Sequence, residues 1–534
     1  MRLKFLTAEE AVKIIKSGST VATGGFVGNC VPEELEMELE KRYLQTEEPK
    51  NLTLVYVAGQ GDGKDRGINH FGYEGMIKRV IGGHWGLAPK VQKLALENKI
   101  EGYTFPQGVI AHLFRDIAAG KPGTITHVGL KTFVDPRIEG GKLNKKTKED
   151  LVEVIDLYGK EYLFYKAFPI DFALLRGTYA DERGNVTMEK EVGSLEVLSI
   201  AQACKNSGGK VIVQVEKVVK AGTLDPRLVK IPGIYVDTVV EVQDMKNHMQ
   251  TFSEQYNPGY TGNIKVPVSS VKPMELDERK IIARRAVMEL VPNAIVNLGI
   301  GMPEGVSIVA NEEGVSDQMI LTVEPGPIGG IPVGGLSFGA TINPEAIIDQ
   351  PNQFDFYDGG GLDVAFLGLA ECDEFGNINV SKFGPKITGP GGFINITQNA
   401  KKVVFCGTFT AGGLKIEAAN GKLSILQEGK VVKFIGKVEQ ITFSGKYAEE
   451  VGQTVIYITE RAVFELGEDG LVLTEIAPGI ELVKDVLEYM DFKPVISKNL
   501  KLMDERIFKS EKMGVQIEQK FPSEALEVSL VEAH

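Results

Sequence analysis

The hydrophobic pattern near the N-terminus predicts a helix, a strand and a glycine-rich loop in quick succession. Apolar residues recur at helical spacing over residues 8–16, and Thr7 with Glu10 forms the capping box that begins such a helix. A short β-branched strand follows over residues 20–23 and leads directly into a glycine-rich loop over residues 24–29. A loop of this kind lets a ligand approach the backbone closely.

The same order of elements recurs in the second half of the chain. The pattern predicts a helix over residues 277–290, a strand over residues 294–297 and a glycine loop over residues 299–301. Pro303 then opens another helix, as Pro32 does after the first glycine loop. The recurrence indicates an internal duplication.

Two segments marked by aspartates support this duplication. Asp171 begins an apolar run that ends in Asp-Glu-Arg-Gly-Asn at residues 181–185. Asp363 begins a similar run that ends in Asp-Glu-Phe-Gly-Asn at residues 373–377, 192 residues further on. The starting aspartates and the ends of the two runs are separated by the same number of residues, which indicates two copies of one structural unit.

The alternation of short β-branched strands with helices predicts two related α/β domains, each built on an open, largely parallel sheet. Residues 245–273 show little periodicity and are interpreted as a linker. We therefore expect a first domain over residues 1–270, including the linker, and a second over residues 271–534. In such sheets, ligands bind at the carboxyl ends of the strands.

Composition and charge exclude several classes of function. The chain is 43% hydrophobic and 25% charged, as in ordinary globular proteins. Its formal charge of −13 argues against binding to the phosphate backbone of a nucleic acid. No apolar run approaches the roughly 18 residues of a membrane span, and acidic residues occur within the first ten positions. These features predict a cytoplasmic protein with no nucleic-acid or membrane partner.

The cysteines and histidines do not show the spacing of a metal site. The four cysteines lie far apart without a Cys-x-x-Cys pair, and the six histidines lack the spacing of zinc ligands. The sequence therefore predicts a reducing compartment and no bound metal.

Glu324 is the strongest candidate for a reactive group. An apolar strand over residues 319–323 ends at this single carboxylate, and the next eleven residues contain five glycines and three prolines. Such a turn is stiff at the prolines and free of side chains at the glycines, so that a bulky substrate could reach the carboxylate. The alternative is an ordinary residue at a strand end, followed by a plain turn.

The same region also resembles a dinucleotide-binding unit. A strand leads into Gly299, Gly301 and Gly305, and a second strand ends in an acidic residue 25 positions after Gly299. The third glycine falls one place late, however, and Pro303 interrupts the loop. A nicotinamide-dependent oxidoreductase is therefore one alternative, and a non-catalytic module that senses a CoA ester or a sugar phosphate is another.

Taken together, these motifs resemble family I coenzyme A transferases of the propionate or acetate CoA-transferase type. The resemblance rests on Glu324 in its glycine-rich turn, on the loops at residues 24–29 and 297–304, and on the fused plan of two halves. It covers nearly the whole chain, including residues 177–185 and 391–398. It implies an enzyme that transfers CoA between short-chain carboxylic acids, with CoA as substrate and covalent intermediate, no bound cofactor and a homo-oligomeric assembly, a dimer or a tetramer.

The resemblance also implies roles for individual residues. Glu324 would attack the acyl-CoA and carry a glutamyl-CoA thioester through a ping-pong reaction, while the Gln107 side chain and the Gly392 N–H stabilise oxyanions. As a nucleophile, Glu324 is expected to be ionised among backbone N–H donors, without a raised pKa. The predicted residues for binding substrate or CoA are Gly25, Phe26, Gly28, Asn29, Asn297, Gly299, Gly301 and Gly391.

Overall fold

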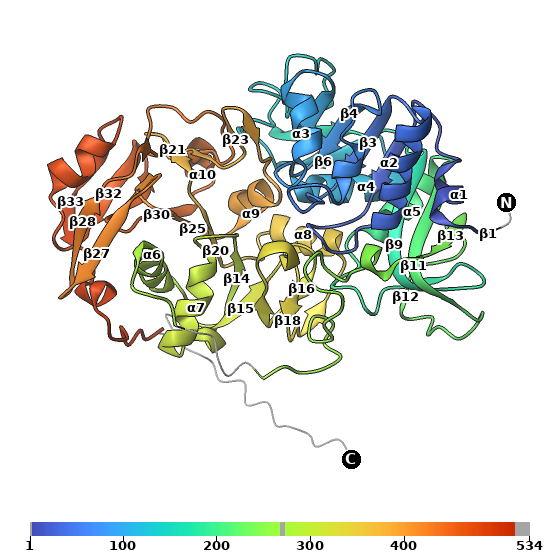
Figure 1. Cartoon of the computed structure of the whole chain (residues 1–534). Helices are drawn as coiled ribbons and strands as arrows, with labels where there is room; N and C mark the ends of the chain where they lie inside the picture. The colour runs from blue at the N-terminus through green and yellow to red at the C-terminus, as the bar shows by residue number, and fades with distance from the viewer. Residues whose placement is uncertain (1–2, 268–272, 518–534) are drawn as a thin grey trace.

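The computed structural model describes residues 3–267 and 273–517, which form two α/β halves that lie side by side (Figure 1). The predicted boundary between residues 270 and 271 lies outside the described residues. Each half is built around one large sheet, so the predicted fold class, mixed α/β with largely parallel sheets, is confirmed.

The sheet of the first half is parallel along its main path. Two short strands, β10 (Val186–Thr187) and β12 (Val229–Ile231), add to it in antiparallel pairing beside β9. Across the sheet, the strands of the main path are β1 (Lys4–Phe5), β13 (Thr238–Glu241), β11 (Lys210–Val219), β9 (Phe172–Asp181), β2 (Thr20–Thr23), β3 (Leu52–Tyr56), β4 (Ile77–Gly82) and β5 (Glu101–Thr104).

The sheet of the second half has a parallel centre flanked on both sides by antiparallel pairs, and the strand at its far edge pairs in parallel with its neighbour. Its four strands from β14 to β30 repeat the order and direction of four strands in the first half, β2, β9, β11 and β13. Across the sheet, the strands are β19 (Ala346–Ile347), β16 (Pro327–Ile328), β15 (Met319–Thr322), β14 (Ala294–Leu298), β20 (Val364–Gly368), β25 (Lys402–Cys406), β30 (Thr454–Ile458), β31 (Ala462–Gly467), β32 (Gly470–Ile476) and β33 (Val495–Leu502).

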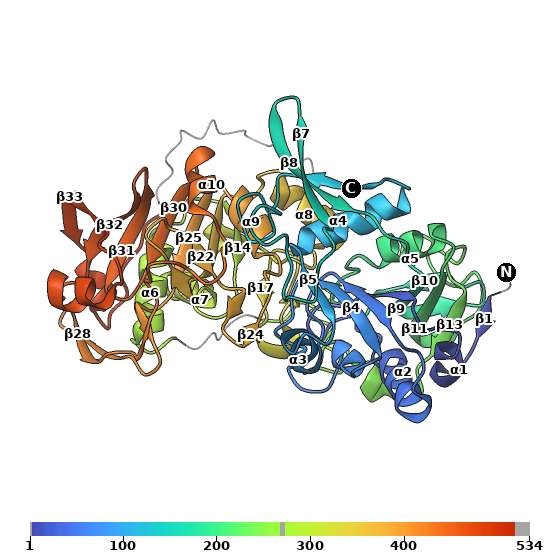
Figure 2. The same cartoon turned by 90° about the horizontal axis from the view of Figure 1, so that it is seen from above.

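Helices cover the sheets, and a separate three-stranded arm of β6 (Gly123–Thr126), β7 (Val152–Leu157) and β8 (Lys160–Lys166) projects from the first half (Figure 2). Within the described residues, no helix combines the length and apolar character needed to cross a membrane. The helices are α1 (Ala8–Val12), α2 (Glu33–Thr46), α3 (Pro89–Leu96), α4 (Gln107–Ala118), α5 (Val197–Asn206), α6 (Glu278–Val287), α7 (Glu304–Glu313), α8 (Gln350–Asp358), α9 (Phe393–Asn399) and α10 (Gly445–Glu450).

The local sequence signals located several of these elements. The capping box of Thr7 and Glu10 is present in the structure, but α1 ends at Val12 rather than at residue 16. The prolines expected inside the first helical turn act as N-caps instead, since α2 and α7 begin one residue after Pro32 and Pro303.

The aspartates of the repeat make matching contacts in the two halves. Asp171 accepts a hydrogen bond of 2.7 Å from the Thr20 N–H, and Asp363 accepts one of 2.9 Å from the Ile295 N–H. In each case the aspartate N–H also donates back to the carbonyl of the same partner, over 3.0 and 2.9 Å. The carboxylate therefore fixes the register between two neighbouring strands in both sheets, as the predicted duplication requires.

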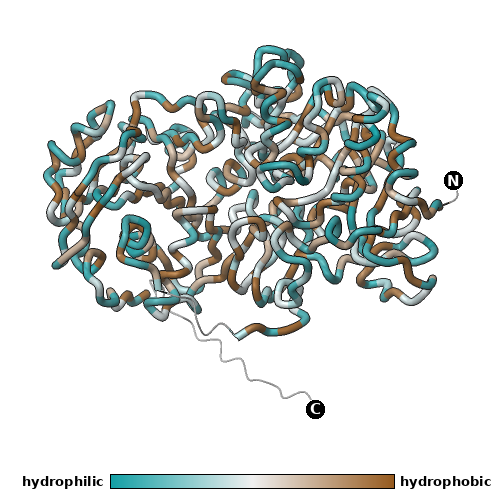
Figure 3. The backbone as a smooth tube through the Cα atoms, viewed as in Figure 1, coloured by the Kyte–Doolittle hydropathy of each residue, from teal (hydrophilic) through white to brown (hydrophobic). Residues whose placement is uncertain are grey.

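The hydrophobic cores follow the alternation along the strands. In β3, Leu54 faces one cluster of buried residues and Val55 faces the other, so both sides of the first sheet are covered. The second half has one extensive cluster of its own. Figure 3 shows hydrophobic stretches along the inner strands of both halves and hydrophilic stretches on the outer loops.

Candidate active site

Glu324 lies in a tight hairpin turn that joins β15 to the antiparallel strand β16. The Val323 N–H donates to the Pro327 carbonyl over 3.0 Å, and the Gly326 N–H donates to the Val323 carbonyl over 3.0 Å. Gly326 has a φ of +121°, and a Cβ there would lie 1.9 Å from the Ile348 carbonyl oxygen. Only glycine fits this position, so the turn holds Glu324 in a defined place.

The Glu324 carboxyl group is buried in surroundings that offer it few donors. The residue is 9% exposed, and its Oε2 has no hydrogen-bond partner among the described residues. Burial raises the pKa of Glu324 to about 7, and its own backbone N–H is the one group that lowers it. The expectation of an unraised pKa among backbone donors is therefore wrong, because burial outweighs the one backbone N–H that lowers this pKa.

Two consecutive glycines connect Glu324 with Gln107 of the first half. A Cβ on Gly392 would lie 3.1 Å from the Glu324 Cγ, and a Cβ on Gly391 would lie 3.6 Å from the Gln107 Oε1. Gln107 is the first residue of α4, and its N–H donates to the Gly391 carbonyl over 2.9 Å. Its side-chain Nε2 is buried and has no acceptor within the part of the chain that the structure describes. The structure thus brings Glu324, Gln107 and Gly392 together.

Backbone hydrogen bonds hold the glycine segment of the second half against a loop of the first. The Gly391 N–H donates to the Gly83 carbonyl over 2.8 Å, and the Trp85 N–H donates to the Thr388 carbonyl over 2.7 Å. Gly83 cannot carry a side chain, because its Cβ would lie 2.2 Å from the Val57 carbonyl oxygen. The site is therefore assembled from both halves of one chain.

A buried polar group supports β15 just before Glu324. The Tyr357 hydroxyl donates to the Thr322 Oγ1 over 2.9 Å and accepts from the Gln353 Nε2 over 2.8 Å. The predicted binding residue Asn297 donates from its Nδ2 to the Thr322 carbonyl over 3.3 Å. Burial and the negative charge of Glu324 raise the pKa of Tyr357 well above its usual range. Sequence reasoning missed Tyr357 and Gln353, for which the spacing of two polar residues one helical turn apart was the sole signal.

The second-half glycine loop lies open beside Glu324. It follows β14, which pairs directly with β15. Gly301 is exposed with a φ of +87°, its Cβ position is free of neighbours within 4 Å, and Ile300 is 60% exposed. A Cβ on Gly299, by contrast, would lie 3.0 Å from the Leu367 Cδ2. The loop is thus exposed at the carboxyl end of the sheet, and its role in binding stays a prediction.

The first-half glycine loop is instead covered by other parts of the chain. A Cβ on Gly28 would lie 2.5 Å from Phe252 of the linker, and the rings of Phe26 and Phe338 lie 5.7 Å apart. The Asn29 Nδ2 donates to the Phe338 carbonyl over 2.7 Å. This loop therefore packs against the linker and the second half, and its binding role stays a prediction. The predicted binding residues that are buried here are Gly25, Phe26, Gly28 and Asn29.

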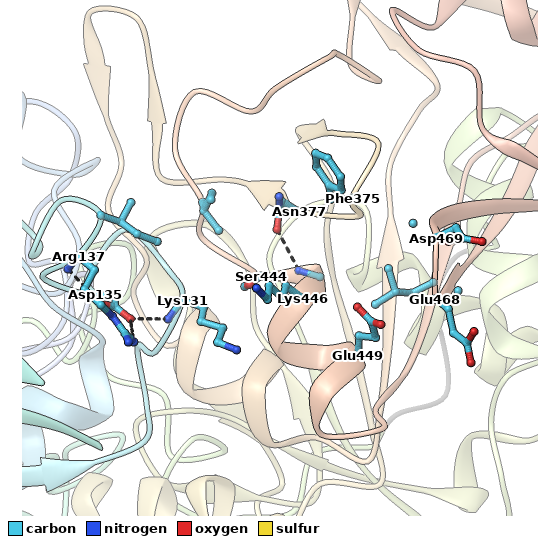
Figure 4. Close-up of a pocket in the computed structure, with 16 residues that line it drawn as sticks. Lys131, Asp135, Arg137, Phe375, Asn377, Ser444, Lys446, Glu449, Glu468 and Asp469 are labelled. Atoms are coloured by element: carbon cyan, nitrogen blue, oxygen red, sulfur yellow. Dashed lines mark hydrogen bonds and ion pairs between the residues drawn. The ribbon is translucent and has the colours of Figure 1, made fainter. Parts of the chain in front are cut away.

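A separate cleft of about 650 Å³ lies elsewhere between the halves (Figure 4). Residues 131–138 form one side of it, and residues 375–377, 441–449 and 466–470 form the other. Its charged side chains have both signs, and none of the predicted site residues lines it. The Glu324 carboxyl group and this cleft therefore lie at different places on the molecule.

The arrangement of potential metal ligands and the burial of the cysteines bear on two other kinds of chemistry. Among residues 3–267 and 273–517, no group of three or more His, Cys, Asp or Glu side chains is arranged to hold a metal ion. The four cysteines are buried and free. Burial raises the pKa of each cysteine thiol, which disfavours the reactive thiolate.

A buried carboxylate in a glycine turn, joined through two consecutive glycines to a buried amide from another α/β unit, suits acyl transfer through a covalent intermediate. Comparison with known proteins agrees with this class. The family model described as Coenzyme A transferase matches residues 5–242. The chain is 49% identical over 515 residues, 96% of either chain, to the acetate CoA-transferase YdiF of Escherichia coli O157:H7. It is 50% identical over 510 residues to the caffeate CoA-transferase of Acetobacterium woodii, covering 95% of this chain and 97% of that protein.

A crystal structure of YdiF from E. coli O157:H7, in a thioester complex with CoA, superimposes with a TM-score of 0.90. The two chains are 47% identical, and the match covers 97% of this chain and 98% of that one. The chain belongs to the coenzyme A transferase family and is an enzyme that transfers CoA. The comparisons give no support to a nicotinamide-dependent oxidoreductase or to a non-catalytic sensor.

Proposed function

We propose that this enzyme transfers CoA between short-chain carboxylic acids, such as acetate, propionate or butyrate, by a ping-pong reaction on Glu324. The observation that carries the proposal is the juxtaposition of three groups from both halves. Within residues 3–267 and 273–517, one Glu324 carboxylate oxygen and the Gln107 Nε2 have no hydrogen-bond partner, and Gly391 and Gly392 lie beside Gln107 and Glu324 respectively. An attacking oxygen and an oxyanion donor on either side of one small space are what the chemistry requires.

The reaction balances without metal or nucleotide. The Glu324 carboxylate attacks the carbonyl carbon of the acyl-CoA, the C–S bond breaks, and a mixed anhydride and the CoA thiolate result. The thiolate then attacks the glutamyl carbonyl carbon, and the first acid leaves as a carboxylate. A second carboxylate reverses these steps on the glutamyl-CoA thioester, takes the CoA and restores Glu324.

Each attack places negative charge on a carbonyl oxygen. The Gln107 Nε2 and the Gly392 N–H are the proposed donors to that oxygen, because Gly392 adjoins Glu324, Gln107 adjoins Gly391, and the Nε2 has no partner among the described residues. A preorganised donor of this kind typically contributes about 3 kcal/mol to the stabilisation of a transition state.

The proposed class of substrate follows from the similar proteins. The relatives named above are an acetate and a caffeate CoA-transferase, so the acyl group differs within the family. The acetate CoA-transferase, 49% identical over 96% of this chain, supports the short-chain class proposed here.

Further features of the enzyme are inferred from the sequence. CoA is proposed to act as substrate and covalent intermediate, without a resident cofactor, because the thioester exchange needs none. We also infer a homo-oligomer in the cytoplasm. Light scattering on the purified enzyme tests the assembly, and fractionation of the source cells tests the compartment.

The deciding experiment is the intact mass of the enzyme after brief incubation with acetyl-CoA and no acceptor acid. The expected result is a gain of CoA less water, located by peptide mapping on Glu324 and discharged by propionate. Glu324→Ala should form no adduct, whereas Glu345→Ala should react normally, since Glu345 is an exposed carboxylate beside the same glycine turn. An adduct that persists in Glu324→Ala would refute the proposal.

A further inference from the structure

Helix α4, which begins with Gln107, lacks a cap of its own. Its N-cap residue is Pro106, which makes no side-chain hydrogen bond to the helix. The first N–H groups of a helix have no acceptor within that helix, and Ser, Thr, Asp or Asn at the N-cap normally supplies one. These N–H groups must therefore find acceptors elsewhere.

The acceptors come from the other half of the chain. The Gln107 N–H donates to the Gly391 carbonyl over 2.9 Å, and the Gly108 N–H donates to the Asn395 Oδ1 over 3.1 Å. Asn395 belongs to α9 and is fully buried. Figures 1 and 2 show α4 beside α8 and α9, and residues of these helices are in contact.

Asn395 is itself held in one orientation. Its Nδ2 donates to both carboxylate oxygens of Asp358 in α8, over 2.9 and 3.2 Å, so its Oδ1 must face α4. A Cβ on Gly108 would lie 2.5 Å from the Asn395 Nδ2 and 2.5 Å from the Phe354 Cδ1. The absence of a side chain at Gly108 is what allows this close approach.

Other contacts between α4 and the second half lie on later turns of the helix. His112 Nε2 lies 3.1 Å from the Pro351 carbonyl oxygen, and Arg115 forms two hydrogen bonds of 2.8 Å with Asp355. These contacts dock the helix as a whole, but they do not reach its first turn. The orientation of that turn depends on Gly391 and Asn395.

We propose that Asn395 is a positioning residue that caps α4 from the other half and thereby aims the Gln107 side chain at the oxyanion beside Glu324. The inference rests on the role proposed for Gln107. Asn395 does not touch the reacting atoms in this scheme. It acts through the backbone of the helix that carries Gln107.

The same helix α9 offers a matched control. Gln398 is also buried and also joins the halves, accepting from the Gly129 N–H over 2.7 Å and donating to the Leu130 carbonyl over 2.9 Å. Its partners lie away from the first turn of α4. Asn395→Ala and Gln398→Ala should therefore lower the melting temperature similarly, while Asn395→Ala alone slows catalysis.

The experiment measures the single-turnover rate of adduct formation from acetyl-CoA, the KM for acetyl-CoA and the melting temperature. Asn395→Ala should lower the rate at least tenfold with the KM changed less than threefold, and Gln398→Ala should keep the rate within threefold of wild type. A double variant that exchanges Asn395 and Asp358 tests directly whether the hydrogen bonds of Asn395 orient α4. Asn395→Asp alone places a carboxylate against Asp358 and should be slow, whereas Asn395→Asp with Asp358→Asn restores donor and acceptor and should regain most of the rate.

The outcomes separate the two proposals. Gln107→Ala is measured alongside, and a wild-type rate in that variant would overturn the role of Gln107 itself. If Gln107→Ala is slow but Asn395→Ala matches Gln398→Ala, the positioning role is wrong while the proposed function stands. Failure of the exchanged pair to recover, with a melting temperature near that of wild type, would also overturn it.

Discussion

The raised pKa of Glu324 should give adduct formation a pH dependence that an ordinary glutamate would not produce. Attack on the acyl-CoA requires the ionised carboxylate, and burial raises the pKa of this group from 4.5 to about 7. The rate of the first half-reaction should therefore rise with pH through neutrality. An unperturbed glutamate would be ionised almost completely over the same range.

The magnitude follows from the titration curve. With a pKa of about 7, the ionised fraction increases from about one tenth at pH 6 to about nine tenths at pH 8, so the rate should increase roughly tenfold. Two groups near Glu324, His84 and Tyr357, do not titrate in this interval. Burial lowers the pKa of His84 to about 4, and the pKa of Tyr357 lies well above its usual range.

The assay is rapid-quench mass spectrometry of the CoA adduct, with acetyl-CoA far below its KM so that the profile reports the free enzyme. A single ionisation with a midpoint between pH 6 and 8 is expected. The acetyl-CoA dissociation constant, measured with Glu324→Ala across the same pH range, serves as the control for binding. A rate that stays level from pH 6 to pH 8 would refute the reasoning from burial.

Three further predictions concern the same site. Gln107→Ala should slow adduct formation by roughly 100- to 1,000-fold in single-turnover measurements, the usual effect of losing one oxyanion donor, with less change in the KM. Gly392→Ala should lower activity because its Cβ would crowd the Glu324 Cγ at 3.1 Å, whereas Gly436→Ala, with no neighbour within 4 Å, should remain active in the same assay. Burial disfavours the ionised form of Glu324 in the folded state. Glu324→Gln should therefore raise the free energy of unfolding at pH 8, measured by urea titration, by up to about 3 kcal/mol, and the difference from wild type should shrink toward pH 5.

Much of the fold could be predicted because its signals are local. The capping box of Thr7, the strand at residues 20–23 and the helix that follows Asp277 each depend on a few neighbouring residues, and the structure contains all three. The repeated aspartates could also be identified in the sequence, because Asp171 and Asp363 each bind a strand within their own half of the chain. The extension of the second sheet by β31, β32 and β33 was not predicted, and the parallel pairing of β32 with β33 joins residues about 25 positions apart that no local signal links.

The site was predicted only in part, for a similar reason. Glu324, Gln107 and Gly392 could be named from the family resemblance, but the contacts among them cross the two halves. The covering of Gly28 by Phe252 depends on how the linker folds back, and the pKa of Glu324 depends on everything packed around it. None of these properties is carried by residues adjacent in the sequence.

The matching strand registers identify the residue that occupies the place of Glu324 in the other half. Thr20 and Ile295 both donate to the repeated aspartates, and their neighbours in the next strand are Thr53 and Ile320. Four residues beyond Ile320 is Glu324, and four residues beyond Thr53 is Val57, which is fully buried. The symmetry of the two copies is thus broken at Glu324. One half carries a carboxyl group at this position and the other half carries a buried valine, so that the duplication of the fold did not duplicate the proposed nucleophile.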